Sequence, residues 1–466
     1  MADLKELNSA DLPEALPLKK LIGPSFILLG LGLGSGELIL WPYLSSNFGL
    51  GIIWAAVVGI TFQFFLNMEI ARYTLVNGES IFVGFARRFG RIAPIWFIAS
   101  TLIPWMWPGI IASSATLFAA IFGRSYSPYL AMALLILIGI ILSVGKVIYK
   151  TQEQLQKAII LIGIPFIFIL TFIIAEPLDW IALLRGLVGS GDGYLFLPKG
   201  IPYATLLGAL AYAGAGGNLN LAQSYYVKEK GYGMGKYAGR LTSIITGKKE
   251  EVRLEGTTFP DTPENIKKFN LWWKNINTEH LLVFWATGAI TMVLLSLLAF
   301  SSVYGNEGVA TGINFVIAES VVISSTVGII FGKLFLATAA VMLFGTQFSV
   351  IASTSRIMSE NLIIAAPHKF KINDASKHFY MFLWLQIAAG IIIFSIGFTE
   401  PLTLVITSAV LNAITMFIYS GLLIFLNKTQ LRKTVQPSLF RILAVGSAFL
   451  FYGGFSIYTI LQHLLK

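Results

Sequence analysis

Residues 23–42 read GPSFILLGLGLGSGELILWP, and this stretch decides the fold. Four glycines crowd its middle, at Gly30, Gly32, Gly34 and Gly36. About 20 mostly apolar residues are enough to cross a bilayer, so the stretch predicts a membrane span. A carboxylate, Glu37, follows the glycines directly. Because a charge at the centre of a span costs about 2.5–3.5 kcal/mol on insertion scales, we expect Glu37 to serve a function.

The composition of the whole chain agrees with a membrane protein. Of its 466 residues, 56% are hydrophobic and 12% are charged, and the mean hydropathy is +0.76. A soluble domain carries about 25% charged residues, so a soluble protein is excluded. There is no cysteine, which excludes disulfides, thiolate metal sites and a catalytic thiol.

The apolar runs predict eleven spans. Backbone groups inside a bilayer have no water to bind, so each span must be helical and the fold class is all-α, a polytopic membrane protein. The expected ranges are 21–45, 49–71, 92–122, 128–145, 156–175, 202–227, 281–303, 327–352, 379–399, 401–427 and 440–463. The run near 309–325 is either a further span or a short interfacial helix. No short apolar core precedes a small-residue cleavage site, so no removable signal peptide is expected.

The positive residues predict the orientation of the chain. With the N-terminus in the cytoplasm, the inner loops hold 28 of the 33 Lys and Arg residues and the outer loops hold five. This asymmetry follows the positive-inside rule. We therefore expect residues 1–20 to form a cytoplasmic tail, residues 228–280 a cytoplasmic loop, and the C-terminus to lie outside. The net charge of +10 reflects this topology and does not indicate a nucleic-acid site.

The first and sixth expected spans resemble each other. Residues 201–223 read IPYATLLGALAYAGAGGNLNLAQ, again with glycines at the middle. At an offset of 178 residues, Pro24 matches Pro202, Leu29 matches Leu207, Gly30 matches Gly208 and Gly36 matches Gly214. We expect an inverted pair of five-span repeats, residues 21–175 and 202–427, followed by an eleventh span at 440–463.

Glycine-interrupted spans at corresponding positions of two repeats indicate a substrate site near the middle of the membrane. Glycine lowers the cost of unwinding a helix, and the freed carbonyl and amide groups then become ligands. We expect Glu37 and Asn218 to hold a cation with the help of their neighbours. The expected binding residues are Gly34, Ser35, Gly36, Glu37, Ala213, Gly214, Ala215, Asn218 and Gln347. Close packing of small residues between helices is the alternative.

Other charged residues are expected near the ends of the spans. Glu69 and Arg72 lie near the inner end of the second span, where they would form a gate or reach toward the interface by snorkelling. Glu319 and Lys333 are expected near the outer surface, both solvated. The four histidines, His280 among them, lack the spacing of a metal-dependent membrane enzyme. No catalytic or nucleotide-binding motif is present, so neither an enzyme activity nor a cofactor is expected.

Four short motifs carry a resemblance to a known family. They are Gly23-Pro24, Asn77-Gly78, Asn218 with Leu219, Leu221 and Ser224, and Gly345-Thr346-Gln347. They are similar to motifs of the Nramp (natural resistance-associated macrophage protein) family of divalent-metal transporters, over most of the chain. The resemblance implies a LeuT-type inverted repeat with broken first and sixth helices. It also implies secondary-active transport of a small cation by alternating access, and we expect a monomer in the bilayer.

The functional motifs differ from those of the family. The stretch Gly34–Glu37 stands where the family has Asp-Pro-Gly-Asn, and Ala215-Gly216-Gly217 stands where it has Met-Pro-His. Trp107 and Ile110 replace the acidic residues that the family uses for proton passage in the third span. Loss of the thioether removes the soft ligand that favours transition metals. An oxygen-only site that also suits magnesium is therefore expected, and both uncoupled transport and symport with protons stay open.

The turn Gly34-Ser35-Gly36 also resembles the Gly-Ser-Gly turn of amino-acid/polyamine/organocation transporters, in which backbone amides hold a substrate carboxylate. Glu37 would then face a substrate amine. Abundant aromatic residues around the cavity would favour this alternative, and the candidates are Trp41, Tyr212 and Phe344. Transport of a small organic solute, such as an amino acid or an amine, remains the alternative to cation transport.

Overall fold

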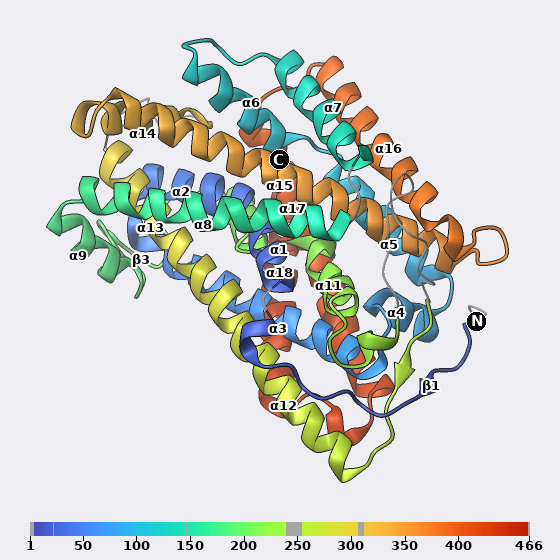
Figure 1. The fold of residues 1–466 in the computed structure, drawn as a ribbon. Coiled ribbons are helices and arrows are strands. Elements are labelled where there is room, and N and C mark those ends of the chain that lie inside the picture. Colours follow the sequence, from blue (N-terminus) through green and yellow to red (C-terminus); the bar gives the residue numbers. More distant parts are fainter. Residues whose placement is uncertain (1–3, 22, 145–147, 239–253, 306–311, 465–466) are drawn as a thin grey trace.

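The computed structural model describes residues 4–21, 23–144, 148–238, 254–305 and 312–464, and it is built almost entirely from helices (Figure 1). Among these residues, nine helical stretches are long and apolar enough to cross a membrane. They are Pro24–Phe48, Leu50–Asn77, Ile92–Ile121, Gln152–Ile174, Pro263–Val303, Ile329–Ala365, Ala375–Ser395, Pro401–Gln430 and Leu439–Leu461. The expectation of an all-α, polytopic membrane protein is confirmed.

The two other expected spans are also helical. The fourth is α7 (Pro128–Val144), an apolar helix of 17 residues. The sixth is divided into two shorter helices, which are described below. Parts of the expected segments lie outside the described residues, namely Ile22, residue 145, residues 239–253 of the loop, and residues 309–311.

The first span runs through the middle of the molecule, and it is irregular where the glycines lie. Helix α1 (Pro24–Gly32) continues into the π-helical segment η2 (Leu33–Leu40) and then into α2 (Trp41–Phe48). The amide of Trp41 donates to the carbonyl of Gly36, five residues back. The expected break therefore takes the form of a widened helix. The apolar window of this span is 94% buried, whereas that of the last span, α18, is 28% buried.

The sixth span is interrupted outright. Helix α10 (Tyr203–Ala211) ends, five residues without helical structure follow, and the chain resumes as the 3₁₀ segment η4 (Gly217–Ala222) and helix α11 (Gln223–Glu229). Gly216 and Gly217 have φ angles of 75° and 50°. Only glycine adopts this left-handed region at no steric cost, so the two glycines allow the chain to turn there.

The remaining helices surround these two spans. In the third span, Pro104 lies within α5, and α6 starts at Gly109 after a short break. Proline lacks the N–H of a regular helix, which accounts for an interruption near this point. The seventh span is a continuous stretch of 41 residues from α12 through η6 to α13. Helices α7 and α16 pack together at one edge (Figure 1).

These helices and the short elements between them have the following bounds. In chain order they are β1 (Asn8–Ser9), η1 (Leu18–Lys20), η3 (Leu50–Ile52), α3 (Trp54–Asn77), α4 (Ile81–Phe89), α5 (Ile92–Trp105), α6 (Gly109–Ile121), α8 (Ile148–Ile174), α9 (Pro177–Gly186), β2 (Ser190–Gly191), β3 (Tyr194–Leu195), η5 (Gly233–Tyr237), β4 (Thr257–Thr258), α12 (Pro263–His280), η6 (Leu281–Ala286), α13 (Thr287–Val303), α14 (Asn314–Thr326), α15 (Ile329–Ala365), η7 (Ile372–Asp374), α16 (Ala375–Ser395), α17 (Pro401–Gln430), η8 (Lys433–Val435) and α18 (Leu439–Leu464).

The N-terminal segment, residues 4–21, crosses one end of the helix bundle, which we call the N-terminal end (Figure 1). Its strand β1 pairs in parallel with β4, with Asn8 opposite Thr257. The indole N–H of Trp272 in α12 donates to the carbonyl of Pro13 at 2.8 Å. The segment is therefore attached to the loop that joins the sixth and seventh spans.

The expectation for Glu319 is wrong, whereas Lys333 is exposed as expected. Glu319 lies on α14 and is only 3% exposed. Helix α14 packs against both α13 and α15, so the face that carries Glu319 is covered. The sequence of a short helix does not reveal which neighbouring helices will cover it.

Candidate functional site

The glycine-rich segments of the first and sixth spans lie in direct contact. A Cβ atom added to Gly36 would lie 1.6 Å from the carbonyl oxygen of Tyr212. One added to Gly32 would lie 2.8 Å from the backbone of Gly214. Glycine is required at both positions because the two backbones touch. Gly32 and Gly36 therefore serve the close packing that was the alternative to binding, and this packing brings the two irregular segments together.

Gln63 of α3 holds the break in the sixth span. Its side-chain amide donates to the carbonyl of Ala211 at 2.9 Å, and its side-chain oxygen accepts from the amide of Gly216 at 3.2 Å. One side chain thus satisfies backbone groups on both sides of the interruption. A buried polar backbone group without a partner is costly inside a membrane, so Gln63 makes this break stable.

Tyr212 forms an aromatic and polar cluster within the break. Its ring stacks on Trp105 of α5, with the centroids 5.4 Å apart. Its hydroxyl lies 2.6 Å from the hydroxyl of Ser408 and accepts a hydrogen bond from the amide of Asn412 at 2.9 Å, both on α17. The cluster therefore joins the third, sixth and tenth spans.

Glu37 is fully buried, and both of its carboxylate oxygens lack a hydrogen-bond partner among the described residues. The buried hydroxyl of Ser35, in the same π-helical segment, also lacks one. The carboxylate points to the seventh span, because a Cβ added to Gly288 of α13 would lie 3.4 Å from Glu37 Oε1. Buried polar groups are nearly always hydrogen-bonded, and an unpartnered one calls for an explanation such as a missing ion. Glu37 is therefore placed to accept a cation or a proton.

Asn218 is buried at the start of the second half of the sixth span. Its side-chain amide donates to the hydroxyls of Ser100 at 2.9 Å and Thr101 at 2.8 Å, both on α5. Its side-chain oxygen has no partner among the described residues. Asn218 thus contacts the third span while Glu37 contacts the seventh, so the expected metal pair of Glu37 and Asn218 stays a prediction.

The eighth span contributes the remaining expected residues. The hydroxyl of Thr346 donates to the carbonyl of Gly30 at 2.9 Å. A Cβ added to Gly34 would lie 2.5 Å from that same hydroxyl oxygen. Gln347 is 4% exposed. Helix α15 therefore packs along the first span at the level of the glycines. Ala213, Gly214 and Ala215 are all buried in the break of the sixth span.

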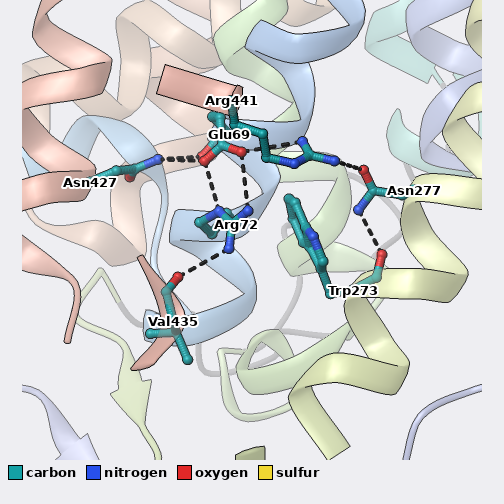
Figure 2. Close-up of polar contacts among 7 residues, drawn as sticks. All are labelled: Glu69, Arg72, Trp273, Asn277, Asn427, Val435 and Arg441. Carbon is teal, nitrogen blue, oxygen red and sulfur yellow. Dashed lines mark hydrogen bonds and ion pairs between the residues drawn. The ribbon is translucent and has the colours of Figure 1, made fainter. Parts of the chain in front are cut away.

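The pair Glu69 and Arg72 is present and belongs to a larger network at the N-terminal end (Figure 2). Arg72 Nε donates to Glu69 Oε2 at 2.7 Å, and Arg441 of α18 donates to Glu69 Oε1 at 3.2 Å. The amide of Asn427 in α17 donates to the carbonyl of Glu69 at 2.9 Å. Both guanidinium groups stack on Trp273 of α12, at 3.8 Å for Arg72 and 4.6 Å for Arg441.

The network joins spans that are distant in sequence. Arg72 also donates to the carbonyl of Val435 at 3.1 Å, and Arg441 donates to the side-chain oxygen of Asn277. It therefore connects the second, seventh, tenth and eleventh spans at one end of the bundle. Among the described residues, no three His, Cys, Asp or Glu side chains lie together as a metal site would require.

Sequence reasoning missed several of these residues. Gln63 lies in an apolar stretch of the second span, and a lone amide there is a signal that it has a buried partner. Arg441 was counted only as a positive residue of an inner loop. Asn412 and Ser408 gave no signal, because their partner Tyr212 lies 200 and 196 positions earlier in the sequence.

Comparisons with known proteins reveal the fold. No family model matches the sequence, and no curated protein matches it. A solved structure of a mutant manganese transporter from Eremococcus coleocola is 13% identical, covers 98% of this chain and 91% of that chain, and has a TM-score of 0.70. The same transporter in complex with an aromatic bis-isothiourea substituted compound is 14% identical, with the same coverage and a TM-score of 0.67.

Sequence identity this low establishes the fold and nothing further. The likeness extends over almost the whole chain, including the first and sixth spans that meet at the centre. The chain therefore shares the fold of the manganese transporter, in agreement with the all-α, many-span architecture expected from the sequence.

Proposed function

We propose that this chain is a secondary-active transporter that moves a divalent metal cation across a membrane by alternating access. The observation that carries the proposal is Glu37, a fully buried carboxylate in the irregular part of the first span with no hydrogen-bond partner among the described residues. A positive charge brought to this position would relieve the cost of burying the carboxylate. The fold shared with a manganese transporter supports the same reading.

The proposed site uses oxygen ligands only. Glu37 supplies the carboxylate, and the amide oxygens of Asn218 and Gln347 and the carbonyls near Gly34 and Ala213 complete the shell. The unpartnered side-chain oxygen of Asn218 supports its inclusion. Its amide nitrogen is held by α5, which leaves the side-chain oxygen as the atom that would bind the cation. Hard cations such as Mg²⁺ and Mn²⁺ prefer oxygen ligands of this kind.

We place the N-terminal end of the bundle in the cytoplasm, with the C-terminus outside, on the evidence of the Lys and Arg asymmetry. The network around Glu69 then acts as a closed inner gate, since it links four spans that must separate for a cation to leave on that side. We further propose two five-span repeats, residues 21–175 and 202–427, and a monomeric transporter. Symport with protons is part of the proposal, and a separate proton site that sets the pH dependence of transport is argued below.

The decisive experiment measures uptake of Mn²⁺ and of Mg²⁺ into proteoliposomes, with and without a proton gradient. Wild type is compared with Glu37→Gln, which removes the charge and keeps the shape. The matched control is Glu264→Gln on α12, whose carboxylate is 76% exposed. We expect wild type to take up at least one of the two metals. In Glu37→Gln the apparent affinity for that metal should fall by at least about 100-fold, because losing a direct ligand should cost more than the 10–100-fold lost with a group that only supports a ligand.

Unchanged uptake in Glu37→Gln would remove this residue from the site. If neither metal is transported by any variant, cation transport is wrong, and a binding screen with amino acids and amines tests the organic-solute alternative. In that case the stacked rings of Trp105 and Tyr212 at the break become the first place to look for the solute.

A further inference from the structure

A second group of buried polar side chains lies between the first and seventh spans, away from Glu37. The hydroxyl of Ser25, in the first turn of α1, lies 2.6 Å from Glu279 Oε2 and 2.8 Å from His280 Nδ1, both at the end of α12. Glu279 is 4% exposed and His280 is fully buried. The other carboxylate oxygen of Glu279 and the other ring nitrogen of His280, Nε2, have no partner among the described residues.

Counting hydrogens identifies what this cluster lacks. The single hydroxyl hydrogen of Ser25 can serve Glu279 or His280, but not both. When it is donated to Glu279, Nδ1 of His280 must carry a hydrogen and donate it to Ser25 Oγ. Nε2 then has a bare lone pair, and Glu279 Oε1 is bare as well. One additional proton, on either of these two atoms, converts a buried negative charge into a neutral cluster.

The surroundings of the cluster favour such a neutral state. The ring of His280 stacks between Phe284, at a centroid distance of 4.6 Å, and Phe64 of α3, at 5.6 Å. Apolar walls of this kind raise the cost of an uncompensated charge. Serine, imidazole and carboxylate remain linked in both protonation states, so a proton can enter or leave without dismantling the cluster.

A few other titratable groups face the cluster from neighbouring elements. Lys230, which follows α11, acts electrostatically on Glu279, and its ammonium group also pairs with Glu153 of α8 at 3.2 Å. Glu153 pairs in addition with Lys157 at 2.6 Å. Tyr232 lies near enough to Glu279 to interact with its charge, and its hydroxyl donates to the carbonyl of Leu21.

On α3, the charged groups nearest along the helix from Phe64 are Glu69 and Arg72, which belong to the network at the N-terminal end. The ammonium group of Lys230, at the end of α11 in the sixth span, favours the charged form of Glu279. A proton on the cluster therefore weakens this electrostatic attraction between the sixth and seventh spans.

The position of the cluster relative to Glu37 gives it a role. His280 precedes Gly288, the residue that faces Glu37, by eight residues of the same continuous helix. Six of these residues form the π-helical segment η6, so the separation along the helix axis is less than the about 12 Å of a regular α-helix. The two buried acidic groups therefore lie along one seam between the first and seventh spans, with the cluster nearer the N-terminal end.

We propose that Ser25, Glu279 and His280 form a proton-binding site in this seam, and that its occupancy sets the pH dependence of transport. The inference rests on the proposed function only for its second part. The site takes one proton from water at the N-terminal end, places it on Nε2 of His280 or Oε1 of Glu279, and returns it to water on the same path. No other group is consumed.

Infrared titration of the purified protein tests the site without any transport. A Glu37→Gln background removes the other unpartnered carboxylate of the seam. Other histidines also titrate between about pH 5 and pH 9, so the test is a difference between variants: we expect one titration in the carboxylic-acid or imidazolium bands of this background to vanish when Glu279→Gln is added. Adding Glu264→Gln, the same change at an exposed position of α12, should leave it intact. A titration unchanged by Glu279→Gln overturns the proposal.

Metal uptake measured against pH tests the role of the site, in variants that keep Glu37. One titrating group changes uptake by at most about tenfold per pH unit. We expect a change of this size in wild type and in Glu264→Gln. In Glu279→Gln, uptake should change by less than about twofold per pH unit. Equal pH profiles in all three overturn the role. If no variant takes up metal while the infrared signal depends on Glu279, the proton site stands and the proposed function fails.

A variant that does not fold is replaced by a milder one. Ser25→Ala keeps both ionisable groups and removes the hydroxyl that links them. We expect it to shift the infrared midpoint by at least about half a pH unit, since the proton then loses a shared hydrogen bond. An unshifted midpoint shows that the three residues do not act together and overturns the proposal.

Discussion

Glu69 and Glu37 are both buried carboxylates, but the protein treats them in opposite ways. Glu69 receives hydrogen bonds from two arginines and an asparagine, contributed by three different spans. Glu37 receives none from the described residues. Burying a charge is costly unless its partners are supplied. The carboxylate of Glu69 connects several spans, whereas the unpartnered carboxylate of Glu37 is the group on which the proposed function rests.

The largest expected effect on stability is that of replacing Glu69, the carboxylate with partners. Replacing Glu69 with Ala leaves the buried Arg72 and the partly buried Arg441 without a counter-charge, and should lower the free energy of unfolding by about 3–5 kcal/mol. Thermal unfolding of the purified protein in detergent measures this. Glu264→Ala, at an exposed position of α12, should change it by no more than about 0.5 kcal/mol. A loss of less than about 1 kcal/mol in the free energy of unfolding of Glu69→Ala would show that the network does not hold the spans together.

The second effect should have the opposite sign. Glu37→Gln removes a charge that has no partner, so the free energy of unfolding should stay the same or rise by up to about 3 kcal/mol, the cost of a carboxylate at the centre of a span. The same unfolding measurement applies. A loss as large as that of Glu69→Ala would mean that Glu37 also holds the protein together, and the contrast between the two carboxylates would collapse.

A third prediction concerns the contact that brings the two irregular spans together. Gly36→Ala places a Cβ against the carbonyl of Tyr212, and backbone atoms cannot move aside easily. We expect a loss of about 1–3 kcal/mol in stability, as for other overpacked sites. Gly454→Ala on α18, where nothing lies within 4 Å, serves as the control and should be neutral. Equal melting temperatures for both variants would contradict the contact.

The smallest expected effect concerns Arg441, one of the two arginines that pair with Glu69. Arg441→Lys keeps the charge beside Glu69 but gives up the stacking on Trp273 and the fork geometry of the guanidinium. We expect a loss of about 0.5–1 kcal/mol, the size of a partly exposed cation–π contact. A double-mutant cycle with Trp273→Leu measures the coupling directly. A coupling indistinguishable from zero would assign Arg441 to charge pairing alone.

Sequence patterns predicted the outline of this molecule well. The run of apolar segments indicated every span, since membrane insertion leaves a strong compositional signal. The matching glycines of the first and sixth spans indicated where the helices become irregular. The pair Glu69 and Arg72, three residues apart on one helix, was also predictable, because that spacing places two side chains on the same face.

What sequence could not predict depends on contacts between distant segments. Arg441 and Glu69 are 372 positions apart in the sequence, and no pattern around either residue predicts that they pair. The side-chain amide of Asn218 donates to two hydroxyls of the third span, and no local pattern predicts this contact. Ser25, Glu279 and His280 each look ordinary in their own segment. They become a cluster only where α1 meets the end of α12.

The π-helical segment of the first span has a consequence for sequence comparison. A π turn bonds residue i to residue i+5 and so holds one residue more than an α turn. An alignment of this span with an ordinary helix therefore needs a one-residue gap within Leu33–Leu40. Without that gap, every position from Trp41 onward is matched about 100° around the helix from its true counterpart. Glu37 lies inside this stretch, so its equivalent in another protein must be found by superposition and not by counting residues.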